Sequence, residues 1–290
     1  MEHDLRTGAY FPVSPRKFIA LSVLTGGLYE IYWFYKNWAF IRSRDESRIV
    51  PLARALFAPL WYPALLVDLR RNLPNGPLIP GGVLGPAAIY FLLTMSWRLP
   101  DPLWLVSFLS FVPLLPAVLR INGVVTPEVS DNYVRNSRWL LRHLFLALFS
   151  MPLIAFVTAS SIGLIPSTQV TPGWMLWGPS QAFLEGAGVL APDEEVFYFY
   201  SQGLLSFEED GNILTDKRVI SYWSDQETGE LFMESAFFSE IRDKVVEQGS
   251  WREPTVLTIV RHDGSEFVLA LSTEEGRDKL FIRRLEQLLR

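Results

Sequence analysis

The sequence contains no cysteine, and only three of its 290 residues are histidine. The absence of cysteine excludes a disulfide framework, a thiolate nucleophile, Cys-ligated zinc and an iron–sulfur cluster. The histidines (His3, His143 and His262) are far apart in the sequence. The serine-hydrolase elbow, the P-loop and the H-E-x-x-H metal motif are missing as well. We therefore expect no catalytic residues, no metal site and no cofactor, and we do not expect an enzyme.

Charged residues are distributed unevenly along the chain. Residues 1–190 contain 15 Lys and Arg against 10 Asp and Glu, a net charge of +5. Residues 191–290 contain 11 against 21, a net charge of −10, and the two parts together give the −5 of the whole chain. An apolar, mildly basic part followed by a polar, acidic part indicates two domains. No basic face is visible in the acidic part, which argues against nucleic-acid binding.

Five apolar segments in the first part approach the length of a membrane-spanning helix. A hydrocarbon core of about 30 Å requires about 20 helical residues. The segments are Phe18–Trp38, Ile49–Val67, Leu78–Trp97, Leu103–Leu119 and His143–Ile165. Tryptophan and tyrosine near their ends, and prolines within them, are typical of membrane helices. We therefore predict that residues 1–165 form an α-helical membrane bundle of about five transmembrane helices, rather than the buried helices of a soluble protein.

The side of the membrane on which the acidic part lies is left open. The distribution of lysine and arginine between the loops favours a cytoplasmic amino terminus. Five spans then place the acidic part on the opposite side. If the segment Ile49–Val67, which contains Arg54, only lies in the interface, four spans remain and the acidic part is cytoplasmic.

Two charged residues lie inside the predicted spans. At a rise of about 1.5 Å per residue, Glu30 is about 12 Å and Arg54 about 7–8 Å from the boundary that the first two spans share. An arginine side chain can bridge that difference, so we predict a charge pair between Glu30 and Arg54. The pair can be structural, the two groups can extend to the lipid headgroups, or they can serve the passage of an ion or substrate.

The composition and the predicted secondary structure change after the predicted helical bundle. Residues 166–189 are rich in Pro, Gly, Ser and Thr and are predicted to be a linker. The residues that follow contain short β-branched and aromatic segments, about seven predicted strands, and an Asp-Gly turn that is a strong hairpin signal. After Ser272–Glu275, apolar residues at helical spacing predict a closing helix. Residues 190–290 are thus predicted to form a β-rich barrel with a carboxy-terminal helix.

Two runs of sequence resemble known families. The run DEEVFYFYSQGLL, followed by DGNILTDKRVISYW, a hairpin and a final helix, resembles the pleckstrin-homology-like (PH-like) domains of many bacterial membrane proteins. Their usual step Leu-Thr-x-x-Arg-hydrophobic is found at Leu214–Ile220, and the resemblance covers residues 190–290. The run LTGGLYEIYWFYKNW resembles the first helix of small bacterial multi-pass membrane domains of unknown function. These resemblances imply a multi-pass protein of the bacterial inner (cytoplasmic) membrane.

Thr215, Lys217 and Arg218 are the candidate interaction residues of the predicted hairpin. The resemblance implies that Lys217 and Arg218 bind a phosphate or lipid headgroup, as eukaryotic PH domains do. The net charge of −10 argues against this, because an acidic domain is repelled by an anionic leaflet. The alternative is structural: the stem of Arg218 covers Tyr222 or Phe199, and its head pairs with Asp216 or Glu208.

We predict an integral membrane accessory or scaffold protein whose PH-like domain docks a protein partner, for example by strand addition at an exposed sheet edge. The alternative is a small transporter or lipid-handling bundle regulated by the PH-like domain. A transporter predicts a cavity lined by the two intramembrane charges, with Thr94, Ser96 and Ser107 converging on it. A scaffold predicts a filled bundle and an exposed apolar patch on residues 190–290. The sequence allows a homo-oligomer and identifies neither partner nor substrate.

Overall fold

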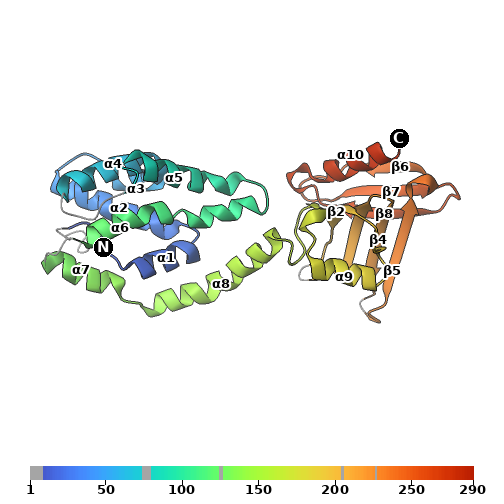
Figure 1. Cartoon of the computed structure of the whole chain (residues 1–290), viewed down its shortest axis with the longest axis horizontal. Coiled ribbons are helices and arrows are strands. Elements are labelled where there is room, and N and C mark those ends of the chain that lie inside the picture. The colour runs from blue at the N-terminus through green and yellow to red at the C-terminus, as the bar shows by residue number, and fades with distance from the viewer. Residues whose placement is uncertain (1–8, 74–79, 124–126, 204–205, 226) are drawn as a thin grey trace. The chain divides into compact units, whose positions relative to one another are not determined.

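Helices form the first half of the chain and strands dominate the second half (Figure 1). The computed structural model describes residues 9–73, 80–123, 127–203, 206–225 and 227–290. The chain divides into two compact units, Met1–Phe156 and Val157–Arg290, which we name the helical unit and the β unit.

Several short helices make up most of the helical unit. Its elements are α1 (Pro15–Leu24), α2 (Leu28–Arg44), α3 (Pro51–Leu56), α4 (Ala58–Asn72), α5 (Leu84–Met95), the 3-10 helices η1 (Ser96–Arg98), η2 (Leu103–Leu109) and η3 (Val112–Leu114), then α6 (Leu115–Asn122), α7 (Pro127–Ser137) and α8 (Leu141–Ser161), which continues into the β unit. Ser14 caps α1 by accepting a hydrogen bond from the Lys17 N–H (3.3 Å), and Pro15 occupies the first helical position.

The prediction of about five membrane spans is wrong for the part of the chain that the structure describes. The first predicted span is interrupted at Gly26 and Gly27, whose positive φ angles (55° and 90°) separate α1 from α2. The second is interrupted at Phe57, between the six-residue α3 and α4. The third begins outside the described residues, and α5 has only 12 residues before the 3-10 turn η1. Each apolar run is therefore longer than the helix it contains.

Two helical stretches within the described ranges are long and apolar enough to cross a membrane. They are Leu103–Asn122, formed by η2, η3 and α6 (20 residues, mean hydropathy 1.8), and α8 (21 residues, mean hydropathy 1.9). Of the most apolar part of each stretch, 39% is buried in the first but only 6% in α8. An exposed apolar helix of this kind is typical of surfaces that contact a membrane or another protein.

Aromatic side chains form the core of the helical unit. Trp33, Phe34 and Trp38 on α2 are buried together with Tyr62 on α4. The rings of Phe34, Tyr62 and Tyr90 have centroids 5.5–5.7 Å apart, and such ring pairs add about 0.5–1.5 kcal/mol each beyond the burial of their area. These contacts hold α2, α4 and α5 together.

In the described residues of the β unit, eight strands form two antiparallel sheets. They are β1 (Thr171–Pro172), β2 (Val196–Tyr200), β3 (Asp210–Thr215), β4 (Arg218–Ser224), β5 (Leu231–Phe237), β6 (Ile241–Glu247), β7 (Thr255–Arg261) and β8 (Glu266–Leu271). The first sheet has the order β1-β2-β3-β4-β5 and the second the order β6-β7-β8. Helix α10 (Asp278–Leu288) ends the chain after the short helices η5 (Phe238–Glu240) and η6 (Glu274–Gly276). From β2 onward, the predicted order of seven strands and a closing helix is confirmed.

Residues 166–189, predicted to be a linker, belong to the β unit. Strand β1 pairs with β2, and the 3-10 helix η4 (Gly173–Met175) and helix α9 (Gly178–Gly186) follow. Val170 and Leu184 are buried in the two cores of the unit. A Cβ on Gly173 would lie 1.8 Å from the Val196 carbonyl oxygen, so glycine is required for this close approach. The glycines and prolines thus shape an ordered segment.

Alternation along β3 and β4 divides the β unit into two cores. Leu214 and Val219 face β7, β8 and Phe281 of α10. Their neighbours Ile213 and Ile220 face the opposite side of the sheet and pack with α9. Helix α10 begins at Asp278 rather than directly after Ser272–Glu275, because η6 and the positive φ (68°) of Gly276 come first. The first sheet is therefore covered on both faces.

Candidate functional site

Thr215 organises the corner between β3 and β4, where the candidate hairpin residues lie. Its hydroxyl oxygen accepts hydrogen bonds from the N–H groups of Lys217 (3.1 Å) and Arg218 (3.0 Å). The same hydroxyl lies 2.7 Å from Oε1 of Glu194, to which it donates. Threonine stabilises such turns because its side chain bonds to nearby backbone groups. The residue is completely buried, so it shapes the turn and is not accessible to a ligand.

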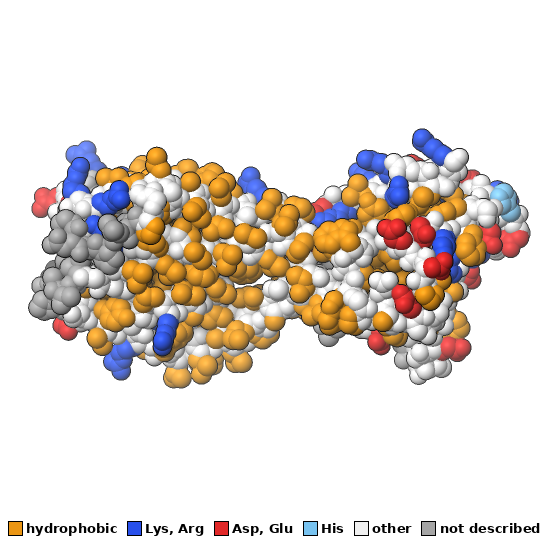
Figure 2. Space-filling model, in the orientation of Figure 1, with side chains coloured by type: hydrophobic (Ala, Val, Ile, Leu, Met, Phe, Trp, Pro, Cys, Tyr) orange, Lys and Arg blue, Asp and Glu red, His pale blue; other side chains and the backbone are white. Residues whose placement is uncertain are grey.

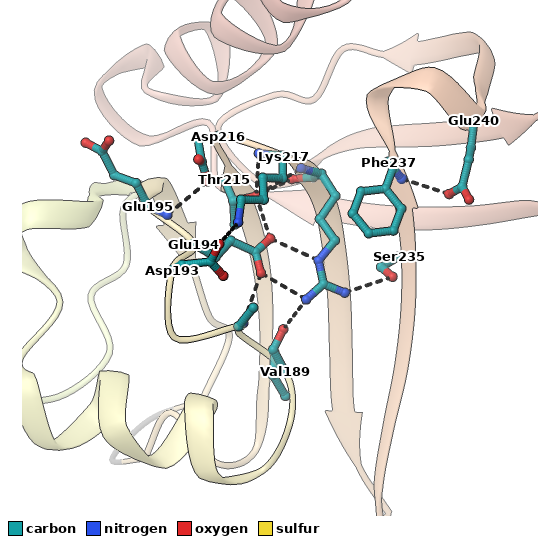
Figure 3. Close-up of polar contacts among 12 residues, drawn as sticks. Val189, Asp193, Glu194, Glu195, Thr215, Asp216, Lys217, Ser235, Phe237 and Glu240 are labelled. Carbon is teal, nitrogen blue, oxygen red and sulfur yellow. Dashed lines mark hydrogen bonds and ion pairs between the residues drawn. The ribbon is translucent and has the colours of Figure 1, made fainter.

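Arg218 forms a buried, bidentate ion pair with Glu194 (Figure 3). Its Nε lies 2.9 Å from Oε1 and its Nη2 lies 2.9 Å from Oε2 of Glu194. The guanidinium also donates to the Val189 carbonyl (3.1 Å) and to the Ser235 hydroxyl (3.3 Å). The side chains are 13% (Arg218) and 1% (Glu194) exposed. Arg218 thereby connects the segment before β2 with strands β4 and β5.

The environment of Glu194 favours its ionised form. Burial by itself would raise the pKa of this carboxyl group. The hydrogen bonds from Arg218, from the Ala191 N–H (3.0 Å) and from Thr215 outweigh burial and lower the pKa below its ordinary value of 4.5. A buried carboxylate is stable in such a site only while its cation and hydrogen-bond donors are present.

Lys217 forms a second ion pair of the hairpin, at the surface. Its ammonium group lies 2.5 Å from Oδ2 of Asp193, and this contact raises the pKa of Lys217 and lowers that of Asp193. Asp216 accepts a hydrogen bond from the Glu195 N–H (2.9 Å). The structural alternative had paired Arg218 with Asp216 or Glu208, but the arginine pairs with Glu194 instead. Both cations of the predicted interaction hairpin therefore have acidic partners from residues 193–194.

The sequence prediction identified Arg218 but missed Glu194. The guanidinium lies 5.7 Å from the ring centroid of Phe237, whereas the structural alternative predicted that the stem covers Tyr222 or Phe199. The predicted acidic partners were Asp216 and Glu208. The acidic run at residues 193–195, directly before β2, offers candidate partners for a cation. It lies beside the β3–β4 corner only because β2 pairs with β3, and this pairing could not be read from the sequence.

Trp223 and Phe232 form an exposed aromatic pair at the far end of the β4–β5 hairpin. They are directly opposite each other in the sheet register, and their rings stack with centroids 6.2 Å apart at 21°. Their exposed fractions are 44% and 41%. By alternation they share a sheet face with the buried Val219 and Ala236. The pair thus extends the core face beyond the part that the protein covers.

Strand β5 is the outer strand of its sheet, and part of its edge is occupied. Arg261 of β7 donates from Nε (3.2 Å) and Nη2 (2.9 Å) to the Ser235 carbonyl. The Phe237 N–H donates to Oε2 of Glu240 (2.9 Å). Side chains that fill edge positions hinder the addition of another strand. Strand addition at this edge is therefore hindered, whereas the exposed aromatic pair is accessible to the side chains of a partner.

Glu30 lines a cavity of about 380 Å³ in the helical unit. The side chain is 2% exposed, and its Oε1 accepts a hydrogen bond from the Ser110 hydroxyl (2.8 Å). The hydroxyl of Ser22, which lines the same cavity, is buried and has no hydrogen-bond partner among the described residues. The other lining residues include Tyr90, Thr94, Trp97, Trp104 and Ser107. The cavity therefore combines a carboxylate, hydroxyl groups and indole rings.

Arg54 does not share this cavity. Its guanidinium carbon lies 4.4 Å from the ring centroid of Trp38 and 4.3 Å from that of Trp61. A cation between two indole rings gains about 0.5–2 kcal/mol from each. Within the described ranges, no ion pair joins Glu30 and Arg54, which have separate partners instead. Of the groups expected around a transport cavity, Glu30, Thr94 and Ser107 line it, whereas Arg54 and Ser96 do not.

The described histidines lie apart. His143 is buried at the start of α8, His262 is exposed in the turn after β7, and His3 lies outside the described residues. In the part of the chain that the structure describes, no three His, Asp or Glu side chains are grouped to hold a metal ion.

Two solved bacterial structures are similar to part of the chain. One is a DUF1696-family protein with a pleckstrin-homology domain from Shewanella loihica, with 18% identity and a TM-score of 0.31, covering 42% of this chain and 98% of that chain. The other is a pleckstrin-homology domain from Shewanella amazonensis, with 22% identity and a TM-score of 0.28, covering 39% and 96%. No family model and no curated protein matches the sequence.

The order of the strands and the final helix in the described part of the β unit agrees with the sequence-based expectation. The unit has seven consecutive antiparallel strands in two sheets, β2–β5 and β6–β8, followed by the amphipathic helix α10. This is the order that the resemblance of residues 190–290 implies. Strand β1 and helix α9 add a segment before it.

The Arg218→Met variant should lose stability in a pH-dependent manner. In a fragment of residues 166–290, which contains both cores of the β unit, we expect the free energy of unfolding at pH 7 to fall by about 3–5 kcal/mol, because Glu194 remains buried without its cation. The wild-type stabilisation by Glu194 is complete above pH 4.5, its ordinary pKa, and is lost as the pH falls through its lowered pKa. In the variant, burial raises the pKa of Glu194, so acid relieves the defect. Urea unfolding should therefore show a difference between the two proteins that shrinks from pH 7 to below pH 4.5.

The Lys217→Met variant is the control for this measurement. Its ion pair with Asp193 lies at the surface, so stability should change little at any pH. A difference between wild type and Arg218→Met that stays constant from neutral to acidic pH would contradict the role assigned to Glu194.

Proposed function

We propose that the protein is an integral membrane accessory protein whose helical unit lies in the bilayer and whose PH-like β unit docks a protein partner. The observation that carries the docking role is the exposed aromatic pair Trp223–Phe232 on a domain whose hairpin cations already have acidic partners.

The exposed surface of α8 supports the membrane location. Seven large apolar side chains of α8 are at least 61% exposed: Leu141, Leu144, Phe145, Leu148, Phe149, Met151 and Leu153. Residues 144–161 contain no charged residue. Transfer of one such side chain from water to an apolar medium is worth about 1.5–3 kcal/mol. Figure 2 shows hydrophobic side chains over much of the visible face of the helical unit.

The charge of the β unit supports a protein partner over an anionic lipid surface. Residues 191–290 have a net charge of −10, and acidic side chains are scattered over the visible face of the unit (Figure 2). Lys217 and Arg218, which correspond to the headgroup-binding cations of the resemblance, are paired with Asp193 and Glu194. Exposed aromatic side chains are the usual anchors of protein interfaces. A partner with an apolar pocket and a basic rim would complement this surface.

A photoreactive amino acid placed at Phe232 tests the docking role. In native membranes we expect the full-length variant to form a discrete protein adduct. The same label at Val268, which is exposed on β8 of the other sheet, is the matched control and should form none. Adding Trp223→Ser should reduce the adduct tenfold or more, because an interface hot spot contributes about 2 kcal/mol or more. A lipid adduct at residue 232, or equal protein adducts at 232 and 268, would contradict the proposal.

A second candidate function, transport or lipid handling, is favoured by the Glu30 cavity. The bundle is not filled, because a carboxylate, hydroxyl groups and two indole rings line a space of about 380 Å³. An organic cation fits this chemistry, because a carboxylate supplies the counter-charge and indole faces attract cations.

The Glu30→Gln variant tests this candidate. Proteoliposomes with the wild-type protein should accumulate the fluorescent cation ethidium faster than empty liposomes, and Glu30→Gln should lose most of this excess rate because the counter-charge is gone. Glu46→Gln, which changes an exposed acid after α2, is the control and should transport normally. Equal rates for wild type, Glu30→Gln and empty liposomes would contradict the hypothesis that ethidium is transported through this cavity.

A further inference from the structure

A second cavity of the helical unit, of about 480 Å³, is lined by basic side chains. It lies among α1, α2, α7 and the first residues of α8. Its basic lining residues are Lys17, Lys36, Arg135, Arg142 and His143, and no Asp or Glu is among the described residues that line it. A volume of this size is typical of small-molecule sites. A cavity with several cations and no described carboxylate presents a positive potential to whatever enters it.

Lys17 is a buried part of this cavity. The residue is 5% exposed, and its Nζ donates to the carbonyl oxygens of Asn136 (2.7 Å) and Arg138 (2.8 Å). An ammonium group has three N–H donors, so one remains for a ligand. The carboxy-terminal end of α7 is held in place because the Ser14 N–H donates to the hydroxyl of Ser137, the last residue of α7 (2.8 Å). The cation is thus fixed in position before any ligand binds.

Arg142 and His143 supply further donors from the start of α8. Arg142 is exposed and has no hydrogen bond or ion pair within the described ranges, in contrast to Arg218 at the β3–β4 corner. Nδ1 of His143 accepts the Leu140 N–H (3.0 Å), so the neutral ring carries its proton on Nε2 as a donor. A guanidinium group matches the geometry of phosphate oxygens, and this is why arginine is common in phosphate sites.

The position of the cavity indicates where such an anion comes from. Arg142 and His143 are the second and third residues of α8, the apolar helix left uncovered by the protein. Trp139 lies just before α8, is exposed, and contacts the His143 ring edge-to-face with centroids 5.8 Å apart. Tryptophan is enriched at the level of the lipid headgroups, and basic pockets beside membrane helices bind anionic headgroups.

We propose that the cavity formed by Lys17, Arg135, Arg142 and His143 binds a phosphate group that has no cation attached to it, either free phosphate or the headgroup of an anionic lipid. The lipid source of this group rests on the proposed membrane location of the helical unit, whereas recognition of the phosphate itself does not.

Binding to the purified full-length protein in a neutral detergent tests the proposal. One titration uses short-chain phosphatidylglycerol, with zwitterionic phosphatidylcholine for comparison, and another uses inorganic phosphate. We expect phosphatidylglycerol to bind more tightly than phosphatidylcholine, and Arg142→Gln to weaken its binding about tenfold, the effect of one lost hydrogen bond to a charged group. Arg135→Gln should weaken it in the same direction.

Arg16→Gln is the matched control, because Arg16 is exposed on α1 next to Lys17 but does not line the cavity. Binding of phosphatidylglycerol that is sensitive to Arg142→Gln assigns a lipid source. Binding of inorganic phosphate with the same sensitivity, and without preference for phosphatidylglycerol, assigns a free anion and holds even if the protein is not embedded in a membrane. If neither probe binds the wild type, or if Arg16→Gln weakens binding as much as Arg142→Gln, the site is rejected.

Discussion

The buried ion pair between Glu194 and Arg218 is the constraint on which the β unit depends. It joins the segment before β2, the β3–β4 corner through Thr215, and β5 through Ser235. Removing two charges from water is costly, and this cost is offset here by bidentate geometry and by additional hydrogen bonds to both partners. Because the arginine is committed to the fold, the docking surface that we propose lies elsewhere, at the aromatic end of the β4–β5 hairpin.

In the helical unit, three charged side chains likewise have partners within the unit. Glu30 accepts a hydrogen bond from Ser110, Lys17 donates to two backbone carbonyls, and Arg54 lies between two indole rings. Two of these three groups also border cavities, one around a carboxylate and the other lined with cations. The two cavities of the helical unit thus differ in the charge of the side chains that line them.

Local patterns in the sequence predicted most of the β unit, and contacts between distant residues account for what was missed. The β7–β8 hairpin follows from its Asp-Gly turn, whereas β1 has only two residues and exists because β2 pairs with it. Thr215 and Arg218 were found by their motif, but Glu194 becomes their partner only after β2 and β3 pair. In the helical unit, the apolar runs predicted which segments are helical. Hydropathy does not detect the helix breaks at Gly27 and Phe57, so the lengths of the helices were not predicted.

A double-mutant cycle of Glu194→Gln and Arg218→Met in the β unit tests the central claim most directly, namely that the hairpin arginine belongs to the fold. Each single substitution removes one partner of a buried pair, so the structure predicts that the double variant is destabilised by about 2–3 kcal/mol less than the sum of the single variants at pH 7. Effects that add to within about 0.5 kcal/mol would show that the two side chains act independently. Arg218 would then be available for a ligand, and the assignment of the docking surface to Trp223 and Phe232 would lose its basis.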